Sequence, residues 1–187
     1  MSSSAIPGGA PPPPPPPPIA KNTASSSAPT PPDVHPNGPQ GGFLVELLVY
    51  NGAPFKDHWA YFIHPSKRSE LGVLMEAAGD VRNGFKIEIE RSHDLATNPP
   101  TKRIPLQWVG HELFGGDTPG PSFETSACKV EAPGKTLNAV DDIAAPTGRK
   151  VKLRNCQTWI VESADQLVED GIFRPEVAGY LHAIEQL

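Results

Sequence analysis

Long apolar segments are absent from this sequence, and none approaches the ~18–20 residues that a membrane-spanning helix requires. The first residues, Met-Ser-Ser-Ser-Ala-Ile-Pro, have neither the positive charge nor the apolar centre of a secretory signal. Positive charge is scarce throughout, with 16 Lys and Arg against 21 Asp and Glu and a formal net charge of −5. A general nucleic-acid binder normally has a basic patch. We therefore expect a cytoplasmic protein with no nucleic-acid partner and no stable membrane insertion.

Cysteine is also rare, because Cys128 and Cys156 are the only two in the sequence. They could form one disulfide at most, and without an export signal we expect both thiols to be free. The sequence has no Cys-x-x-Cys or His-Glu-x-x-His spacing, and neither of the Gly-Gly pairs at 41–42 and 115–116 precedes a phosphate-binding helix start. A serine nucleophile elbow is missing too. We expect no metal and no cofactor.

Proline, in contrast, is abundant at the start of the chain. Residues 1–42 hold 14 of the 24 prolines, including the unbroken run Pro11–Pro18, and almost no large apolar side chains. Such a segment buries too little apolar surface to offset the entropy of ordering, so residues 1–42 are predicted to be a disordered tail. Pro11–Pro18 favours a polyproline II rod. It is either a solvated spacer or a ligand for an SH3, WW, EVH1 or profilin-type groove.

Residues 43–187 have an ordinary composition and predict one domain of α+β class. Apolar runs or alternating patterns favour strands at residues 43–50, 57–64, 72–77 and 85–90, which together predict an antiparallel β-sheet meander. Alternation is clearest in the last of these, where Phe85, Ile87 and Ile89 should point inward. Residues 104–109 predict another short strand, kept to an edge by Pro105.

The C-terminal part of the domain is predicted to be helical and to pack on the sheet. Asn155 is a suitable N-cap for a helix whose apolar side chains recur at helical spacing, and Gly171 is suited to end it. Pro175 favours the start of a second helix. Between sheet and helices, residues 115–148 are rich in Gly, Pro, Asp and Thr and predict long loops, with one strand around residues 128–130.

Three side chains could carry chemistry: His58, Glu76 and Cys156. Cys156 is expected in the first turn of a helix, where unpaired N–H groups and the helix dipole favour a thiolate. A neighbouring imidazolium would favour it further, and a third polar group could orient that imidazole. Each residue also has a plain structural interpretation. Cys156 falls on an apolar stripe, His58 could make an ordinary hydrogen bond, and Glu76 could lie on the wet face of its strand.

The order of three motifs resembles a circularly permuted papain-like domain of the NlpC type, especially the lecithin retinol acyltransferase branch. It is similar as well to uncharacterised fungal proteins with His-Trp-Ala and Asn-Cys-Gln motifs. The pattern spans about residues 43–171, and its motifs are His58-Trp59-Ala60, Gly72-Val-Leu-Met-Glu-Ala-Ala-Gly79 and Asn155-Cys156-Gln157.

The resemblance implies a papain-like fold in which Cys156 is the nucleophile and His58 the general base. The third polar position, often a second histidine, falls on Glu76, which could accept a hydrogen bond from His58. The flanking motif residues Trp59, Asn155 and Gln157 are expected to contribute to binding. The implied function is a thiol hydrolase or acyltransferase that forms a Cys acyl-enzyme from an amide, ester or thioester. The alternative is a non-catalytic papain-like binding module whose polyproline tail recruits a partner.

Overall fold

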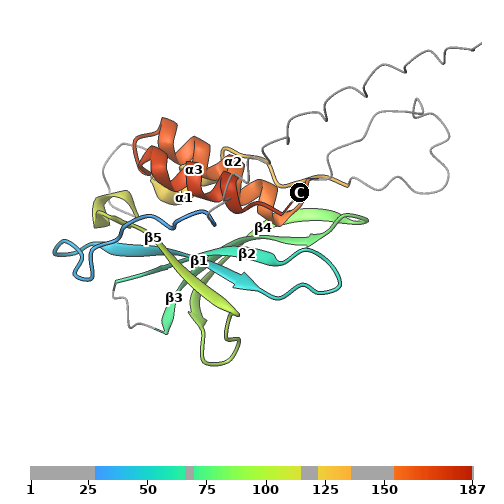
Figure 1. The fold of residues 1–187 in the computed structure, drawn as a ribbon, viewed down its shortest axis with the longest axis horizontal. Helices are drawn as coiled ribbons and strands as arrows, with labels where there is room; N and C mark the ends of the chain where they lie inside the picture. The colour runs from blue at the N-terminus through green and yellow to red at the C-terminus, as the bar shows by residue number, and fades with distance from the viewer. Residues whose placement is uncertain (1–27, 66–69, 115–121, 136–153, 187) are drawn as a thin grey trace, which may run out of the picture.

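The fold has two layers, a five-stranded antiparallel sheet and a group of helices on one of its faces (Figure 1). The computed structural model describes residues 28–65, 70–114, 122–135 and 154–186. Within these residues, no helix is long and apolar enough to cross a membrane. In chain order the elements are β1 (Phe43–Tyr50), β2 (His58–His64), β3 (Leu71–Asp80), β4 (Gly84–Asp94), β5 (Lys102–Val109), a short 3-10 helix (His111–Leu113), α1 (Phe123–Ala127), α2 (Cys156–Glu169) and α3 (Pro175–Ile184).

The strands are ordered β4-β3-β2-β1-β5, so the first four form a meander and β5 returns to pair with β1. This confirms the predicted α+β class, the antiparallel sheet and the C-terminal helices. β5 is an edge strand, as Pro105 indicated, and its pairing with β1 shifts register between Val45 and Glu46. The strand order alone does not show whether the domain is a permuted papain-like fold.

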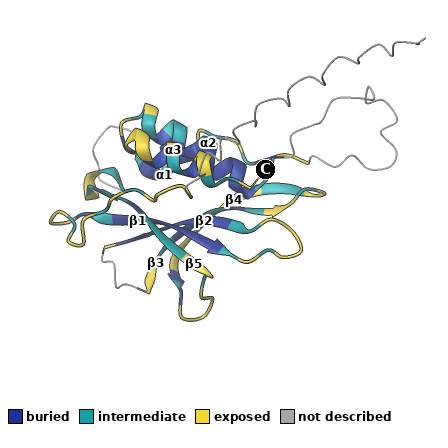
Figure 2. Cartoon of the chain, viewed as in Figure 1, coloured by how far each residue is buried: buried dark blue, intermediate teal, exposed yellow. Residues whose placement is uncertain are grey.

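Alternation along β2 divides the interior into two clusters. Trp59, Tyr61 and Ile63 face the helices and join the larger core, while Ala60 and Phe62 face the opposite side of the sheet. Burial is greatest where the sheet and the helices face each other (Figure 2). The partly buried Phe85, Ile87 and Ile89 of β4 pack against the larger core, as their alternation predicted.

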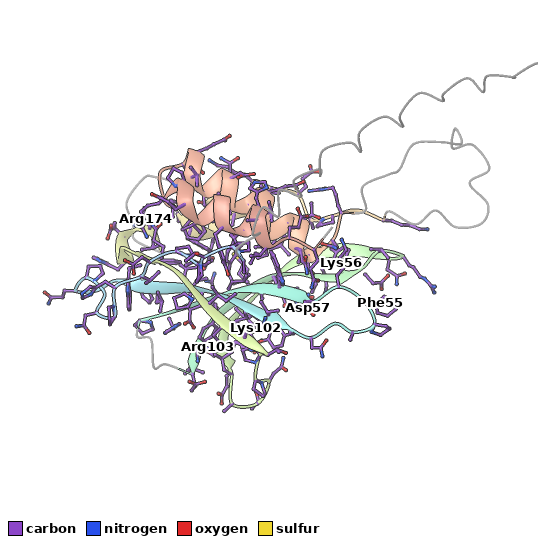
Figure 3. All side chains as sticks on the ribbon, in the orientation of Figure 1. Phe55, Lys56, Asp57, Lys102, Arg103 and Arg174 are labelled. Carbon is purple, nitrogen blue, oxygen red and sulfur yellow. The ribbon has the colours of Figure 1, made fainter. Side chains whose placement is uncertain are left out.

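The sheet face away from the helices holds a buried charge network. Arg103 of β5, labelled in Figure 3, donates to Glu46 Oε2 from Nε at 2.9 Å and from Nη2 at 2.7 Å. Glu46 Oε2 also lies 3.2 Å from His64 Nε2. Burial raises the pKa of Glu46, but the hydrogen bonds with His64 and Arg103 outweigh it and lower that pKa below its usual value. The Glu46 carboxylate is therefore buried as an ion with its partners in place.

Caps fix both ends of α2 where the sequence predicted them. The Asn155 side-chain oxygen accepts hydrogen bonds from the N–H groups of Gln157 at 2.9 Å and Thr158 at 3.1 Å. Gly171 follows the helix with φ of 72°, a left-handed conformation that favours glycine. Pro175 begins α3 in the first turn, where its missing N–H costs nothing.

The strand predicted around residues 128–130 is wrong. The chain instead forms the short helix α1, and Cys128 is its C-cap. Ser122 and Thr125 form a reciprocal capping box, and Phe123 is fully buried against the core. Capping and the burial of Phe123 outweigh the weak strand preference of the residues that follow. The remaining parts of the predicted loop region, 115–121 and 136–148, lie outside the described residues.

Residues 33–42, which we assigned to the tail, lie against β5 and α3. Trp108 Nε1 donates to the His35 carbonyl at 2.9 Å, and Arg174 Nη2 donates to the Asp33 carbonyl at 3.4 Å. Gly38 lies so close to the indole that a Cβ there would be 2.3 Å from a ring carbon of Trp108. The last part of the proline-rich region thus contacts the domain. The run Pro11–Pro18 lies outside the described residues.

Candidate active site

His58 and Glu76 are brought together by the pairing of β2 with β3. Glu76 pairs with Ala60 in the register, so it is a diagonal neighbour of His58 on the same sheet face. The two side chains are joined between His58 Nε2 and Glu76 Oε2 at 2.6 Å. The Glu76 side chain is 19% exposed and that of His58 is 35% exposed. The carboxylate therefore orients the imidazole, as the sequence suggested.

Cys156 is the first residue of α2, and this helix packs against β2 and β3. Cys156 is buried, with only 7% of the residue exposed. Its Sγ lies 4.0 Å from the carbonyl oxygen of Asp57, the residue before His58. The thiol is also close enough to the His58 imidazole to be one of the causes that raise its pKa. The three residues singled out in the sequence are thus brought into one cluster.

His58 is strongly basic in this cluster. Burial lowers its pKa, but the hydrogen bonds with Cys156 and Glu76, together with their negative charges, raise the pKa from 6.5 to about 10. At neutral pH the imidazole is therefore protonated. An imidazolium next to a thiol at a helix N-terminus is the environment that favours a reactive thiolate.

The start of α2 also offers a hydrogen-bond donor beside the sulfur. Asn155 satisfies the next N–H groups of the first turn, because its Oδ1 accepts from Gln157 and Thr158 and its carbonyl accepts from Trp159. The Cys156 N–H has no partner among the residues that the structure describes. This amide is the expected donor to a negatively charged oxygen that develops on a carbon bonded to Sγ.

Gln157 anchors the helix start rather than facing solvent. Its Nε2 donates to the Asp57 carbonyl at 2.7 Å and to Gln186 Oε1 at 2.9 Å, and its Oε1 accepts from the Gln186 N–H at 3.0 Å. The Asp57 N–H donates to the same Gln186 oxygen at 2.8 Å. Figure 3 shows Asp57 on the loop between β1 and β2. These four bonds fix the segment preceding His58 to the residue following Cys156.

The residues expected to bind substrate have different surroundings. Asn155 caps α2 and Gln157 is fully buried beside Asp57, so both position the thiol. Trp59 is 3% exposed and belongs to the core between sheet and helices. Asp57 and Gln186 were not identified from the sequence, because their role depends on backbone contacts that leave no local pattern. Among the described residues, no cluster of three or more His, Cys, Asp or Glu is arranged to hold a metal ion.

Comparison with known proteins places most of the described domain in one family. Residues 45–174 match the family described as "Family of unknown function (DUF6540)", a segment that begins in β1 and ends just before α3. It includes His58, Glu76 and Cys156. No curated protein and no solved structure matches the chain.

Proposed function

Because the chain belongs to the DUF6540 family, whose function is unknown, we propose its activity from its own site: a thiol hydrolase or acyltransferase acting on an amide, ester or thioester. One observation carries the proposal. The His58 imidazole contacts the Glu76 carboxylate at 2.6 Å, and the Cys156 sulfur lies 4.0 Å from the carbonyl oxygen of Asp57, the residue before His58. This grouping supports the nucleophile, base and orienting group arrangement of covalent catalysis.

The order of the parts supports a permuted papain-like arrangement. In such a domain a nucleophile at a helix N-terminus faces a histidine on the adjoining sheet. Here the histidine strand β2 precedes the cysteine helix α2, and the helix lies on the sheet that holds the base (Figure 1). Glutamate is the departure from the pattern that the motifs resemble. Its 2.6 Å contact with His58 supports a role in holding the imidazole.

Acylation begins from the thiolate–imidazolium pair. The Cys156 sulfur attacks the carbonyl carbon, forming a C–S bond while the carbonyl oxygen gains negative charge and accepts a hydrogen bond from the Cys156 N–H. The tetrahedral intermediate then collapses, and the bond to the leaving nitrogen, oxygen or sulfur breaks. His58 gives its proton to the leaving group. The product is a thioester on Cys156 and a neutral imidazole held by Glu76.

Deacylation uses the same groups in reverse. The neutral His58 imidazole removes a proton from water or from an acceptor hydroxyl, amine or thiol, which attacks the thioester carbonyl. When the C–S bond breaks, the thiolate leaves next to the imidazolium that has just formed. The incoming nucleophile decides between hydrolysis and acyl transfer. The geometry supports both outcomes through one acyl-enzyme.

An acyl adduct on Cys156 tests the proposal directly. After brief mixing with p-nitrophenyl acetate at neutral pH, we expect mass spectrometry of the digested protein to find one acetyl group on the peptide that contains Cys156. Cys156→Ser should abolish this adduct, whereas Cys128→Ser should leave it unchanged. The exposed Cys128 is a suitable control because burial and the Glu124 charge raise the pKa of its thiol, which disfavours thiolate. Acetylation of both cysteines to the same extent would instead favour the non-catalytic binding module.

Glu76→Gln should weaken the site without destroying it. Loss of the carboxylate charge removes one of the causes of the raised His58 pKa, so the NMR titration midpoint of His58 should fall below about 10. We expect the acylation rate to fall by roughly tenfold, much less than in Cys156→Ser, because one charge-assisted hydrogen bond is worth ~1.5–3 kcal/mol. An unchanged rate and an unchanged midpoint would remove Glu76 from the mechanism.

The effect of Glu76→Gln on the free energy of unfolding should depend on pH. Since the folded-state pKa of His58 is raised, its interactions stabilise the fold fully below the unfolded value of 6.5, and this contribution is lost as pH rises through about 10. Glu76→Gln should therefore lower the free energy of unfolding most at about pH 6, below the unfolded value of 6.5, and the wild-type advantage should shrink as pH rises to about 10. Urea unfolding of wild type and Glu76→Gln, at about pH 6 and again at about pH 10, measures the difference in their free energies of unfolding.

A further inference from the structure

A polar cavity adjoins the candidate active site on the sheet face away from the helices. It has a volume of about 430 Å³, within the range of small-ligand pockets. His58 is part of its wall, whereas Cys156 is not, so the cavity lies on the Glu76 side of the imidazole. The lining residues come from β1 to β4 and the following loop, and they are Tyr50, His58, Leu74, Glu76, Glu90, His93 and Asn98.

Hydrogen-bond acceptors dominate this lining. Glu76 and Glu90 contribute two carboxylates, and Glu90 Oε2 lies 2.7 Å from His93 Nδ1. A carboxylate at that distance accepts a hydrogen bond from Nδ1, so Nε2 is the ring nitrogen left without this partner. No Lys or Arg is among the lining residues, and Leu74 is their single aliphatic side chain. The composition does not suit an anion or a long acyl chain.

His93 is an independent indication that the cavity holds a ligand. The residue is only 7% exposed, and its Nε2 has no hydrogen-bond partner among the described residues. The buried Tyr50 hydroxyl, on the same lining, also lacks one. Buried polar side-chain atoms nearly always have partners. Burial and the charges of Glu76 and Glu90 raise the pKa of Tyr50, so the phenol is neutral and can accept or donate.

We propose that this cavity binds a primary ammonium or guanidinium group. Its N–H donors would meet the carboxylates of Glu76 and Glu90, beside the unpartnered Nε2 of His93. The positive charge would offset that of Glu90, whose Oε2 contacts His93, while the Glu76 carboxylate is already paired with the His58 imidazolium. Taken together with the proposed function, on which this step rests, the cation is the part of the acyl substrate or acceptor that orients it beside His58.

Binding of a simple cation tests this inference without any turnover. We expect n-butylammonium chloride, added to the full chain, to shift the NMR signals of the His93 and Tyr50 rings with saturation. The neutral analogue 1-butanol at the same concentrations should not shift them. Glu90→Gln should weaken n-butylammonium binding on the order of tenfold, because it removes a charged acceptor.

Glu112→Gln is a matched control for Glu90→Gln. The Glu112 side chain is 59% exposed, against 60% for Glu90, and it too contacts a histidine, with 3.4 Å between its Oε2 and His111 Nδ1. It lies in the 3-10 helix, outside the cavity lining, so n-butylammonium affinity should stay at the wild-type value. Equal weakening by both variants, or equal binding of butanol and butylammonium, would overturn the assignment.

The outcome is separable from that of the proposed function. If n-butylammonium binds as expected while p-nitrophenyl acetate leaves no adduct on Cys156, the cation site stands and the thiol mechanism fails. If the adduct forms but n-butylammonium shifts neither ring, the cation site is wrong and the thiol mechanism stands. The two results depend on different residues, Glu90 and Cys156, although the cavity lining includes His58 and Glu76 of the candidate active site.

Discussion

His58→Ala is expected to lower the rate of Cys156 acylation by roughly 10²–10⁴-fold, the usual contribution of a positioned proton-transfer group. Two effects combine. The thiol loses the imidazolium that favours its ionisation, and the leaving group loses the proton that His58 supplies. Stopped-flow release of p-nitrophenol under single-turnover conditions measures the acylation rate.

His182→Ala provides the matched control. His182 is another partly exposed histidine paired with a carboxylate, with 2.9 Å between its Nε2 and Asp165 Oδ2, but it lies on α3 away from the cysteine. Its removal should leave the acylation rate within about twofold of wild type, since surface ion pairs contribute little. A second variant, His58→Gln, guards against a packing defect. An acylation rate in His58→Gln equal to that of wild type would exclude proton transfer by His58.

Trp159→Ala is expected to destabilise the domain by ~3–5 kcal/mol, the range for removing a large buried aromatic side chain. Trp159 is fully buried on α2 at the junction of helices and sheet. Its ring packs edge-on against Tyr61 with 6.0 Å between centroids, and its Nε1 donates to the Val130 carbonyl at 3.1 Å. The substitution leaves a cavity and an unsatisfied carbonyl together. Urea unfolding followed by circular dichroism measures the loss.

Trp108→Ala is the comparison for this effect. Trp108 is also a tryptophan with a bonded Nε1, but it lies half-buried on the edge strand β5 beneath residues 35–38. Its removal should cost ~1 kcal/mol, the value of one hydrogen bond with modest packing. Similar losses of stability in Trp159→Ala and Trp108→Ala would contradict the placement of the main core between α2 and β2. The melting temperature of Trp159→Ala should fall by ~10 °C or more.

The strands and the helix ends could be predicted because their causes are local. Alternation in residues 85–90 and the apolar run in 43–50 each reflect one strand facing one core. Asn155, Gly171 and Pro175 act within a turn of their own positions. The helix α1 was missed because its capping residues are Ser122 and Thr125, a weaker sequence signal than a Ser or Thr followed by glutamate.

The site was only partly predictable because its contacts join distant segments. Glu76 was noticed as a carboxylate among apolar neighbours, yet its contact with His58 depends on the β2–β3 register, which no short pattern defines. Gln186 lies 29 residues from Gln157 and 129 from Asp57 along the chain. His93 lies beyond residues 85–90, where alternation predicted a strand, but it belongs to β4 and is buried beside Glu90. Only tertiary packing determines which partners these side chains contact.

The distance along the chain between β2 and α2 has a consequence during synthesis. A ribosome releases residues in order, so the imidazole strand emerges about a hundred residues before the sulfur-bearing helix. Until α2 has left the exit tunnel, the nascent polypeptide has a base without a nucleophile and cannot form an acyl-enzyme. Under the proposed thiol mechanism, activity should arise only after α2 has emerged, and terminated products that stop before residue 156 should form no acyl-enzyme through Cys156.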